Sequence, residues 1–280
     1  IPANRPQDAY KVIADDTKPH IPKRLQPYMD RKVTKRTVMT IPYNAKPYSN
    51  ATYIKDALLD KGFIYIGDKS KYDVNHTNLK DAIQDKGETL SREELTILVR
   101  RLRESMNRIV PGPMAVMKWI EKEVASVIKR GPHTWIDCPT KDEPDKKRWA
   151  PIDTELEWVT PSGFVVKQRI MRKETVRIDL QLLGRCQLSV ATHEKNEVDV
   201  SRHKAATAPN LIHSLDASLL HLSVVRFNNP IALIHDSVLT RASDMGSLSA
   251  IIRETYMHLF AEHDYLTEFA QQIGAETEPP

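Results

Sequence analysis

Two stretches of the sequence combine residue types and spacings that could bind a nucleotide and a metal ion. In the first, Arg31, Lys35, Met39 and Tyr43 recur every four residues, so a helix would place them along one slowly drifting stripe. Two cations one turn apart can hold phosphate oxygens, and an aromatic ring can stack on a sugar or a base. From these residues alone, the commoner interpretation is a solvated basic helix face with Met39 packed inward, and a triphosphate clamp is the alternative.

The second stretch is an apolar run, two polar residues and another apolar run. Ile231-Ala-Leu-Ile234 leads into His235-Asp236, and Ser237-Val-Leu-Thr240 follows. This order predicts a tight β-hairpin. A carboxylate at the tip of such a hairpin is costly to bury unless it binds a cation, so Asp236 is a candidate Mg²⁺ ligand. An ordinary turn aspartate is the commoner alternative for so short a pattern.

Helix signals surround the first stretch and fill the middle of the chain. Asp30 can cap a helix that begins at Arg31, and Pro42 must lie in its last turn or end it. Ser91-x-x-Glu94 is a capping box, and apolar residues at helical spacing continue from it to about residue 109. A second helix is predicted over 114–130.

The second half changes to an alternating pattern that predicts β-structure. Residues 155–159 and 164–171 read as strands around a turn, and 175–183 as a further strand of a long basic ribbon. The charged stretch 134–151 and the polar stretch after the ribbon are predicted to be loops. The ribbon carries the basic residues Lys167, Arg169, Arg172, Lys173, Arg177 and Arg185.

Two helices are predicted nearer the end of the chain. One covers about residues 208–221 and places His213 and Asp216 one turn apart, and the other covers 245–262. The string His193-Glu194-x-x-Glu197 lacks the second histidine of a zinc-protease helix and falls in a predicted loop, so we discard it as a metal site.

Composition excludes several classes of protein without deciding the function. Of the 280 residues, 40% are apolar, which suffices for a sizeable core, and there is no collagen-like period and no uninterrupted membrane-length apolar stretch. The formal net charge is only +4, a value that many metabolic enzymes share. The total charge therefore does not demonstrate nucleic-acid binding, and the placement of the charges matters more.

Taken together, four motifs resemble one family. Arg31-x-x-x-Lys35-Arg36-x-x-Met39-Thr40-x-x-Tyr43 resembles motif B of the single-subunit, T7-like phage and mitochondrial RNA polymerases, and Ile234-His-Asp-Ser237 resembles their motif C. Between them, Trp158-Val-Thr-Pro-Ser-Gly-Phe164 resembles the entry into the specificity hairpin. Ala208-Pro-Asn-Leu-Ile-His213-Ser resembles the helix that carries the ribose-sensing histidine. All four occur in the family's order.

The resemblance implies roles for the residues that hold the metal ions and for those that bind the triphosphate. Asp236 would hold the two catalytic Mg²⁺ ions, and His235 would orient the hairpin. Arg31 and Lys35 would bind the triphosphate of the incoming nucleotide, and Lys35 would also protonate the pyrophosphate.

The same resemblance implies further roles. Tyr43 and His213 would favour ribose over deoxyribose, Arg36 would support the motif B helix and Met39 would pack beneath it. The ribbon at 164–190 would be the specificity hairpin. DNA-binding residues on it would be Arg169, Arg172, Lys173 and Arg177.

One part of the family pattern is missing from this sequence. No motif A element, which supplies the second metal-binding carboxylate, precedes Arg31, and the amino-terminal domain and thumb have no counterpart. The resemblance therefore implies either that the chain is a fragment of a longer polymerase or that the polymerase is split. In a split polymerase a partner chain carries motif A and the thumb, as in the heterodimeric polymerases of phages resembling N4. The other partners would be a DNA template, the RNA product, nucleoside triphosphates and an accessory factor for promoter use. The setting would be the cytoplasm of an infected bacterial host, with no membrane.

The implied architecture is α+β, comprising the fingers and the C-terminal palm portion of a right-hand polymerase, mostly helical with a β-ribbon and a palm β-hairpin. Alternatives are a fragment of a family A DNA polymerase and a non-catalytic DNA-binding subunit. Motif C reads His-Asp-Ser here, where DNA polymerases usually carry His-Asp-Glu, and this difference favours an RNA polymerase over a DNA polymerase fragment. Residues 1–24 are predicted to form an N-terminal connector, and residues 25–135 the helical fingers with the motif B helix. Residues 136–205 would form the specificity-hairpin region, and residues 206–280 the palm portion with motif C.

Overall fold

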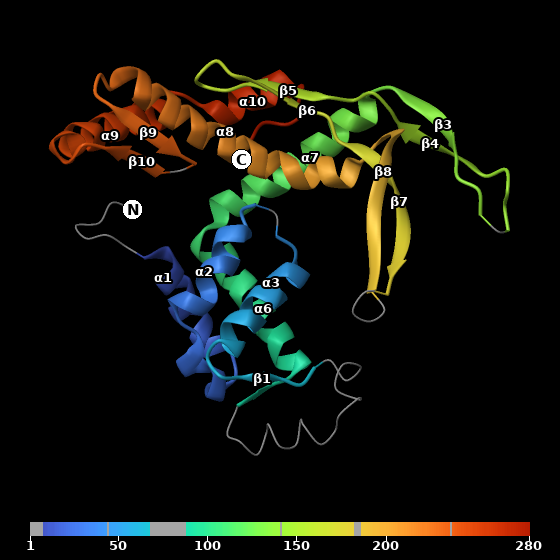
Figure 1. The fold of residues 1–280 in the computed structure, drawn as a ribbon, viewed down its shortest axis with the longest axis horizontal. Helices are drawn as coiled ribbons and strands as arrows, with labels where there is room; N and C mark the ends of the chain where they lie inside the picture. Colours follow the sequence, from blue (N-terminus) through green and yellow to red (C-terminus); the bar gives the residue numbers. More distant parts are fainter. Residues whose placement is uncertain (1–7, 44, 68–87, 141, 182–185, 236) are drawn as a thin grey trace. The chain divides into compact units, whose positions relative to one another are not determined.

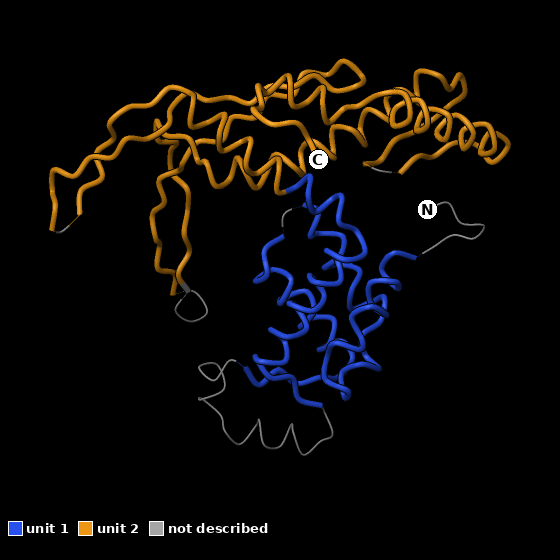
Figure 2. The backbone as a smooth tube through the Cα atoms, turned by 180° about the vertical axis from the view of Figure 1, so that it is seen from behind, with its two compact units in different colours: residues 1–117 blue, residues 118–280 orange. Residues whose placement is uncertain are grey.

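Helices and small two-stranded sheets make up the chain, so the predicted α+β class is confirmed. The computed structural model describes residues 8–43, 45–67, 88–140, 142–181, 186–235 and 237–280. The chain forms two compact units, residues 1–117 and 118–280, which divide within helix α7 (Pro111–Arg130) (Figure 2). The four-part division expected from the sequence stays a prediction. Over the described ranges, no helix combines the length and apolarity needed to cross a membrane.

Unit 1 is built from helices around one apolar core. Short strands β1 (Ile64–Tyr65) and β2 (Thr89–Leu90) pair in parallel beside them. Ile41, Ile54 and Leu102 are wholly buried in this core. Besides the first part of α7, the helices (Figure 1) are α1 (Ala9–Thr17), α2 (Arg31–Thr40), α3 (Pro47–Leu59) and α6 (Arg92–Ile109).

Local signals in the sequence set the ends of α2 and α6 as predicted. The Asp30 carboxylate accepts a hydrogen bond from the backbone N–H of Val33 at 3.1 Å, which satisfies one of the donors at the start of α2. At α6 both halves of the capping box between Ser91 and Glu94 are present. Helix α2 ends at Thr40, two residues before Pro42, as the prolyl ring requires.

In its described residues, unit 2 contains the rest of α7, four antiparallel hairpins, three further α-helices and a short 3-10 helix at Ala242–Asp244 (Figure 1). Its strands are β3 (His133–Asp137), β4 (Lys147–Pro151), β5 (Leu156–Val159), β6 (Val165–Gln168), β7 (Met171–Leu180), β8 (Cys186–Val198), β9 (Ile231–Ile234) and β10 (Ser237–Thr240). Its helices are α8 (Val200–Arg226), α9 (Met245–Ala261) and α10 (Tyr265–Ile273).

The β5–β6 hairpin is held between α10 and α8. The ring of Trp158 meets that of Phe269 edge-to-face at 5.5 Å, a favoured geometry for aromatic pairs. The indole N–H of Trp158 donates to Ser214 Oγ at 3.3 Å, and the N–H of Val159 donates to Gln272 Oε1 at 2.6 Å. These contacts hold the motif that resembles the specificity-hairpin entry against α8 and α10.

The long ribbon β7–β8 is anchored at its base, while its arms are exposed. At the base Met171 pairs with Val198, and both side chains are buried. The nearby Glu197 is only 3% exposed and pairs with two arginines, Arg148 of β4 and Arg172 of β7. The hydrogen bond from Arg148 to Glu197 raises the pKa of that guanidinium and joins two hairpins.

Buried His203 of α8 ties the ribbon to the helix after it. Its Nε2 accepts a hydrogen bond from the backbone N–H of Ile170 at 2.9 Å, just before β7 begins. The side chain has no exposed area, and this burial lowers the pKa of His203, because desolvation disfavours the imidazolium. The folded chain therefore holds His203 neutral.

Three predictions about loops and packing are wrong. The two ends of the expected loop at 134–151 are strands β3 and β4, in which Trp135 pairs directly with Trp149, whereas 138–140 and 142–146 form no strand. The expected polar loop after the ribbon is β8, which contains the whole His193-Glu194-x-x-Glu197 string. Both strands owe their form to cross-strand partners far along the chain, which local pattern does not reveal. Met39 is 44% exposed rather than packed beneath α2.

Candidate functional site

The predicted site residues fall in both units. Arg31, Lys35, Arg36 and Tyr43 lie in unit 1, His213 and His235 lie in unit 2, and Asp236 lies outside the described residues.

Helix α2 presents its cations to solvent because its other face enters the core. Buried residues on it are Val33, Thr34, Thr37 and Val38. Arg31 and Lys35, one turn apart, are both exposed. The structure therefore supports the predicted basic stripe, with the core as the reason for its orientation.

The two cations of the stripe differ in their partners. Arg31 Nε donates to Asp8 Oδ2 at 2.6 Å, and its guanidinium lies 5.3 Å from the centre of the Tyr10 ring. Lys35 makes no ion pair with any residue that the structure describes. A phosphate that binds here would contact Lys35 directly. Arg31 would have to leave the Asp8 carboxylate for the phosphate, or bind both at once.

Arg36 and Tyr43 occupy supporting positions. The Arg36 guanidinium lies 4.2 Å from the centre of the Tyr53 ring, a cation–π contact that joins α2 to α3. The supporting role of Arg36 at the site stays a prediction. Tyr43 lies beyond the end of α2, where its backbone N–H donates to the Thr40 carbonyl at 3.1 Å. Its ring is half-buried and does not continue the helical stripe.

The predicted motif C hairpin is present as β9–β10. Ile234 pairs with Ser237, so only His235 and Asp236 separate the strands. His235 has a φ of +56°, the left-handed conformation that two-residue hairpin turns need and that side chains other than glycine adopt at some cost. The strands thus hold a strained histidine directly beside the candidate metal ligand in sequence.

Helix α8 brings the second predicted histidine to this turn. The ring of His213 lies 6.5 Å from that of His235, centre to centre, at an interplanar angle of 78°. Both side chains are exposed. The structure therefore places together two residues that stand 22 positions apart in the sequence, as expected if both serve one site.

The four candidate DNA-binding residues of the ribbon separate into two kinds. Arg169 pairs with Glu194 at 3.1 Å, and Arg172 pairs with buried Glu197 at 2.8 Å. Lys173 and Arg177 are exposed and lie on the same face of β7. Neither of these two has an ion pair within the described residues, so they are the better placed for phosphates or base edges.

A cationic cavity in unit 1 escaped prediction from the sequence. It has a volume of about 690 Å³ and lies between α3 and α6. Four of its described lining residues are cations and one, Glu104, is an acid. Burial lowers the pKa of Arg103, whose Nη1 donates to Asn50 Oδ1 at 2.7 Å and to the Ala45 carbonyl. The recurrence of arginine along one face of α6 was the available signal.

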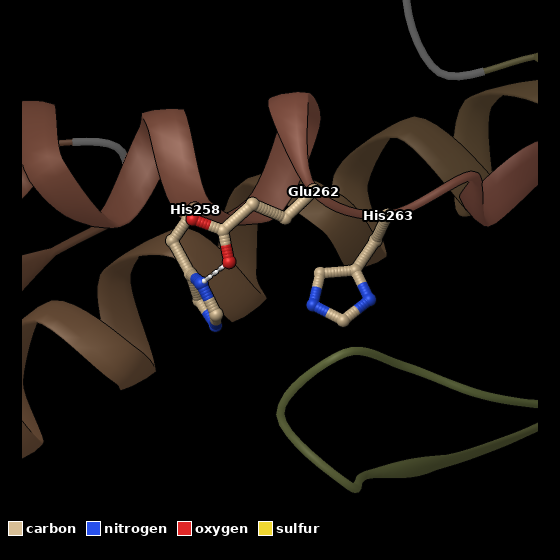
Figure 3. Close-up of side chains that lie close together, drawn as sticks. All are labelled: His258, Glu262 and His263. Atoms are coloured by element: carbon tan, nitrogen blue, oxygen red, sulfur yellow. Dashed lines mark hydrogen bonds and ion pairs between the residues drawn. The ribbon is translucent and has the colours of Figure 1, made fainter.

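One group of side chains in the described part of the chain could hold a metal ion. His258, Glu262 and His263 each offer a ligand atom, and these atoms all lie within 4.8 Å of one another (Figure 3). Two imidazoles and a carboxylate do not suit Mg²⁺, which prefers oxygen ligands. This group is therefore not the site of the Mg²⁺ ions that the resemblance implies.

Comparison with known proteins decides the family. A family model described as DNA-dependent RNA polymerase matches residues 1–279. The chain belongs to the T7-like family of DNA-dependent RNA polymerases. Its similarity to "DNA-directed RNA polymerase" of Enterobacteria phage K11 is 29% identity over 267 residues, 89% of this chain and 25% of the relative.

Other members of the polymerase family show the same partial coverage. "T7 RNA polymerase" of Escherichia phage T7 is 29% identical over 258 residues, 87% of this chain and 25% of the relative. "DNA-directed RNA polymerase, mitochondrial" of Mus musculus is 23% identical over 274 residues, 93% of this chain and 19% of the relative. The chain thus spans about a quarter of the length of its phage relatives, and the match favours an RNA polymerase over the DNA polymerase alternative.

Proposed function

We propose that this chain is one subunit of a split, N4-like RNA polymerase that extends RNA on a DNA template in an infected bacterium. It contributes the nucleotide-binding helix α2 and the hairpin β9–β10. A partner chain contributes motif A and the thumb, and an accessory factor directs promoter use. The family match over residues 1–279 supports the reaction class.

The exposed hairpin β9–β10 is the observation that supports a polymerase divided between two chains. Two strands alone are marginally stable and leave unpaired edges. Leu233 on one face and Ile234 and Leu239 on the other are 40%, 63% and 55% exposed, respectively. Apolar side chains on both faces of a short sheet call for further strands or helices, which we assign to the chain that carries motif A.

Chemistry at the site follows from the donor types. The RNA 3′-hydroxyl attacks the α-phosphate of a nucleoside triphosphate, and pyrophosphate leaves. Two Mg²⁺ ions, held by Asp236 and by a motif A carboxylate of the partner chain, would neutralise the charge that develops on the phosphoryl oxygens. A carboxylate is the ligand that Mg²⁺ prefers, so Asp236 fits this role by type.

This chain's own residues bind and orient the substrate. Exposed Lys35 and Arg31 bind the triphosphate, and Lys35 donates a proton to the departing pyrophosphate. His213 and Tyr43 contact the sugar and select ribose. His235 keeps the turn in its left-handed conformation, and Lys173 and Arg177 bind the DNA.

The test is RNA extension on a primed RNA–DNA scaffold with Mg²⁺. We expect the chain purified with its native partner to extend RNA, the lone chain to be inactive, and Asp236→Asn to abolish extension by the complex. Asp60→Asn, which removes an exposed carboxylate of unit 1, is the matched control and should retain activity. Extension by the lone chain would refute the split, and equal activity of Asp236→Asn would refute the metal role.

A further inference from the structure

The C-terminal end of α9 and the start of α10 bring two histidines and a carboxylate together (Figure 3). His258 lies in the last turn of α9, Glu262 follows that helix, and His263 lies in the connection to α10. Nδ1 of His258 is 2.6 Å from Oε2 of Glu262. One ligand atom from each of the three residues falls within 4.8 Å of the other two.

Neighbouring rings already orient His263. Its imidazole stacks on Tyr265 at 5.4 Å with an interplanar angle of 26° and meets His258 edge-to-face at 5.3 Å. Tyr265 in turn contacts Phe260 of α9 at 6.5 Å. A carboxylate oxygen of Glu268 lies 4.0 Å from Nδ1 of His263 and offers a fourth donor on the first turn of α10.

We propose that His258, Glu262 and His263 bind a divalent transition metal ion of the Zn²⁺ type, with Glu268 or water as the fourth ligand. Imidazole nitrogens with carboxylate oxygens are the donors that such borderline-soft ions select, whereas Mg²⁺ favours oxygen alone. Around a tetrahedral Zn²⁺ the donor atoms lie about 3.4 Å apart.

Small side-chain movements reach that spacing. The ion takes the place of the proton between His258 and Glu262, whose donor atoms separate slightly, while His263 closes in. The three side chains are 41%, 63% and 40% exposed, so solvent gives the ion access and the rotamers are not locked by a core.

The bound ion would fasten two helices that support the candidate site. Helix α9 packs against α8, which carries His213, and α10 packs against β5, with Phe269 against Trp158. An ion that binds only the folded chain raises the free energy of unfolding. The increase grows with the logarithm of the ratio of the ion concentration to its dissociation constant. Unit 2 should therefore unfold at a higher temperature when the ion is present.

Spectroscopy on the tag-free full chain tests the site. Co²⁺ is the probe, because its visible absorption reports tetrahedral coordination, and Zn²⁺ should displace it at one ion per chain while excess Mg²⁺ should not. His263→Ala should weaken Co²⁺ binding at least tenfold, and His221→Ala, which removes an exposed histidine of α8, should leave it unchanged. Equal affinity of His263→Ala and wild type, or no stoichiometric binding, would overturn the proposal.

A second variant separates loss of the site from loss of the fold. His258→Gln keeps a polar side chain on α9, and we expect it to lose the Co²⁺ spectrum while its circular dichroism stays native. Tryptophan fluorescence should show that Zn²⁺ raises the thermal midpoint of the wild type and not that of either variant. A Zn²⁺-dependent rise of equal size in all three would also contradict the site.

Discussion

Helix α2 and the hairpin β9–β10 carry the two halves of the family resemblance, yet their surroundings differ sharply. Helix α2 buries one whole face, including Val33 at 1% exposure, in the core of unit 1. The hairpin leaves Ile234 and Leu239 mostly uncovered. Burial of an apolar side chain contributes about 1.5–3 kcal/mol, so α2 is positioned by its own unit, whereas the hairpin lacks that support in the described residues.

The contrast shows which of the two elements is held in place by contacts within the described residues. The orientation of Lys35 and Arg31 follows from contacts within unit 1. The position of the turn at His235 rests on a two-residue loop and on the neighbouring His213. We therefore expect variants of α2 to act on chemistry, and variants of the hairpin faces to act on assembly.

Among variants of α2, of the hairpin faces and of the ribbon, the largest effect should come from the exposed cation Lys35 of α2. Lys35→Met removes the charge and the proton donor that we assign to the triphosphate, and we expect single-nucleotide extension by the complex to slow about 10²–10³-fold. Lys32→Met is the matched control, because Lys32 is exposed on the same helix and pairs with Asp60 at 3.3 Å. Equal rates for the two variants would break the assignment of the stripe.

Apolar substitutions should separate stability from assembly. Leu102→Ala in the core of unit 1 should lower the free energy of unfolding by about 2–5 kcal/mol, and Leu239→Ala should change it by less than about 0.5 kcal/mol. Urea unfolding followed by circular dichroism measures both. A large loss in Leu239→Ala would mean that the hairpin is already part of a core.

A charge placed on the exposed hairpin face tests whether that face binds the partner chain. Leu239→Asp should weaken co-purification with the partner chain, while Leu188→Asp on the ribbon, where the native side chain is 48% exposed, should not. Loss of the partner from both variants would indicate general unfolding rather than a specific contact.

The ribbon should show smaller effects of two kinds. Arg177→Gln should leave stability unchanged and reduce the salt dependence of DNA binding by about one counterion. Arg172→Gln should instead lower the stability of unit 2 by about 1 kcal/mol, because buried Glu197 loses one of its two arginines. Fluorescence anisotropy at several salt concentrations and urea unfolding distinguish the two, and reversed outcomes would contradict the division.

The smallest effects should appear in the dependence of stability on pH. Because burial lowers the pKa of His203, the unfolded chain binds more protons than the folded chain below about pH 6.5, and unit 2 loses stability as the pH falls. Burial by itself would raise the pKa of the Asp30 carboxyl. The hydrogen bonds from Lys61 and from the backbone of α2, together with the charge of Lys61, outweigh burial, so the pKa lies below its usual value. Its contribution to unit 1 is present above about pH 4 and lost below it.

Fluorescence can follow one unit alone. All four tryptophans lie in residues 118–280, so tryptophan emission reports unit 2, and hydrogen exchange in α6 reports unit 1. His203→Gln should reduce the loss of unit 2 stability that sets in below about pH 6.5. A variant that keeps the full wild-type dependence would show that another group is responsible.

The sequence by itself determined the elements whose signals are local. Asp30 and Ser91 mark helix starts because a cap needs only its own first turn. The turn at His235 follows from two apolar runs with two residues between them. The order of the four motifs along the chain was enough to indicate the family, and the family match over residues 1–279 confirms it.

Tertiary structure decided everything that depends on partners distant in the chain. Strand β8 forms because β7 lies beside it, and buried Glu197 forms ion pairs with arginines from two other strands. Arg31 meets Asp8, and Arg103 lies half-buried without a carboxylate partner in the described residues, for reasons that no spacing reveals. Local backbone geometry depends on a few consecutive residues, whereas burial and charge pairing depend on which surfaces the folded chain brings together.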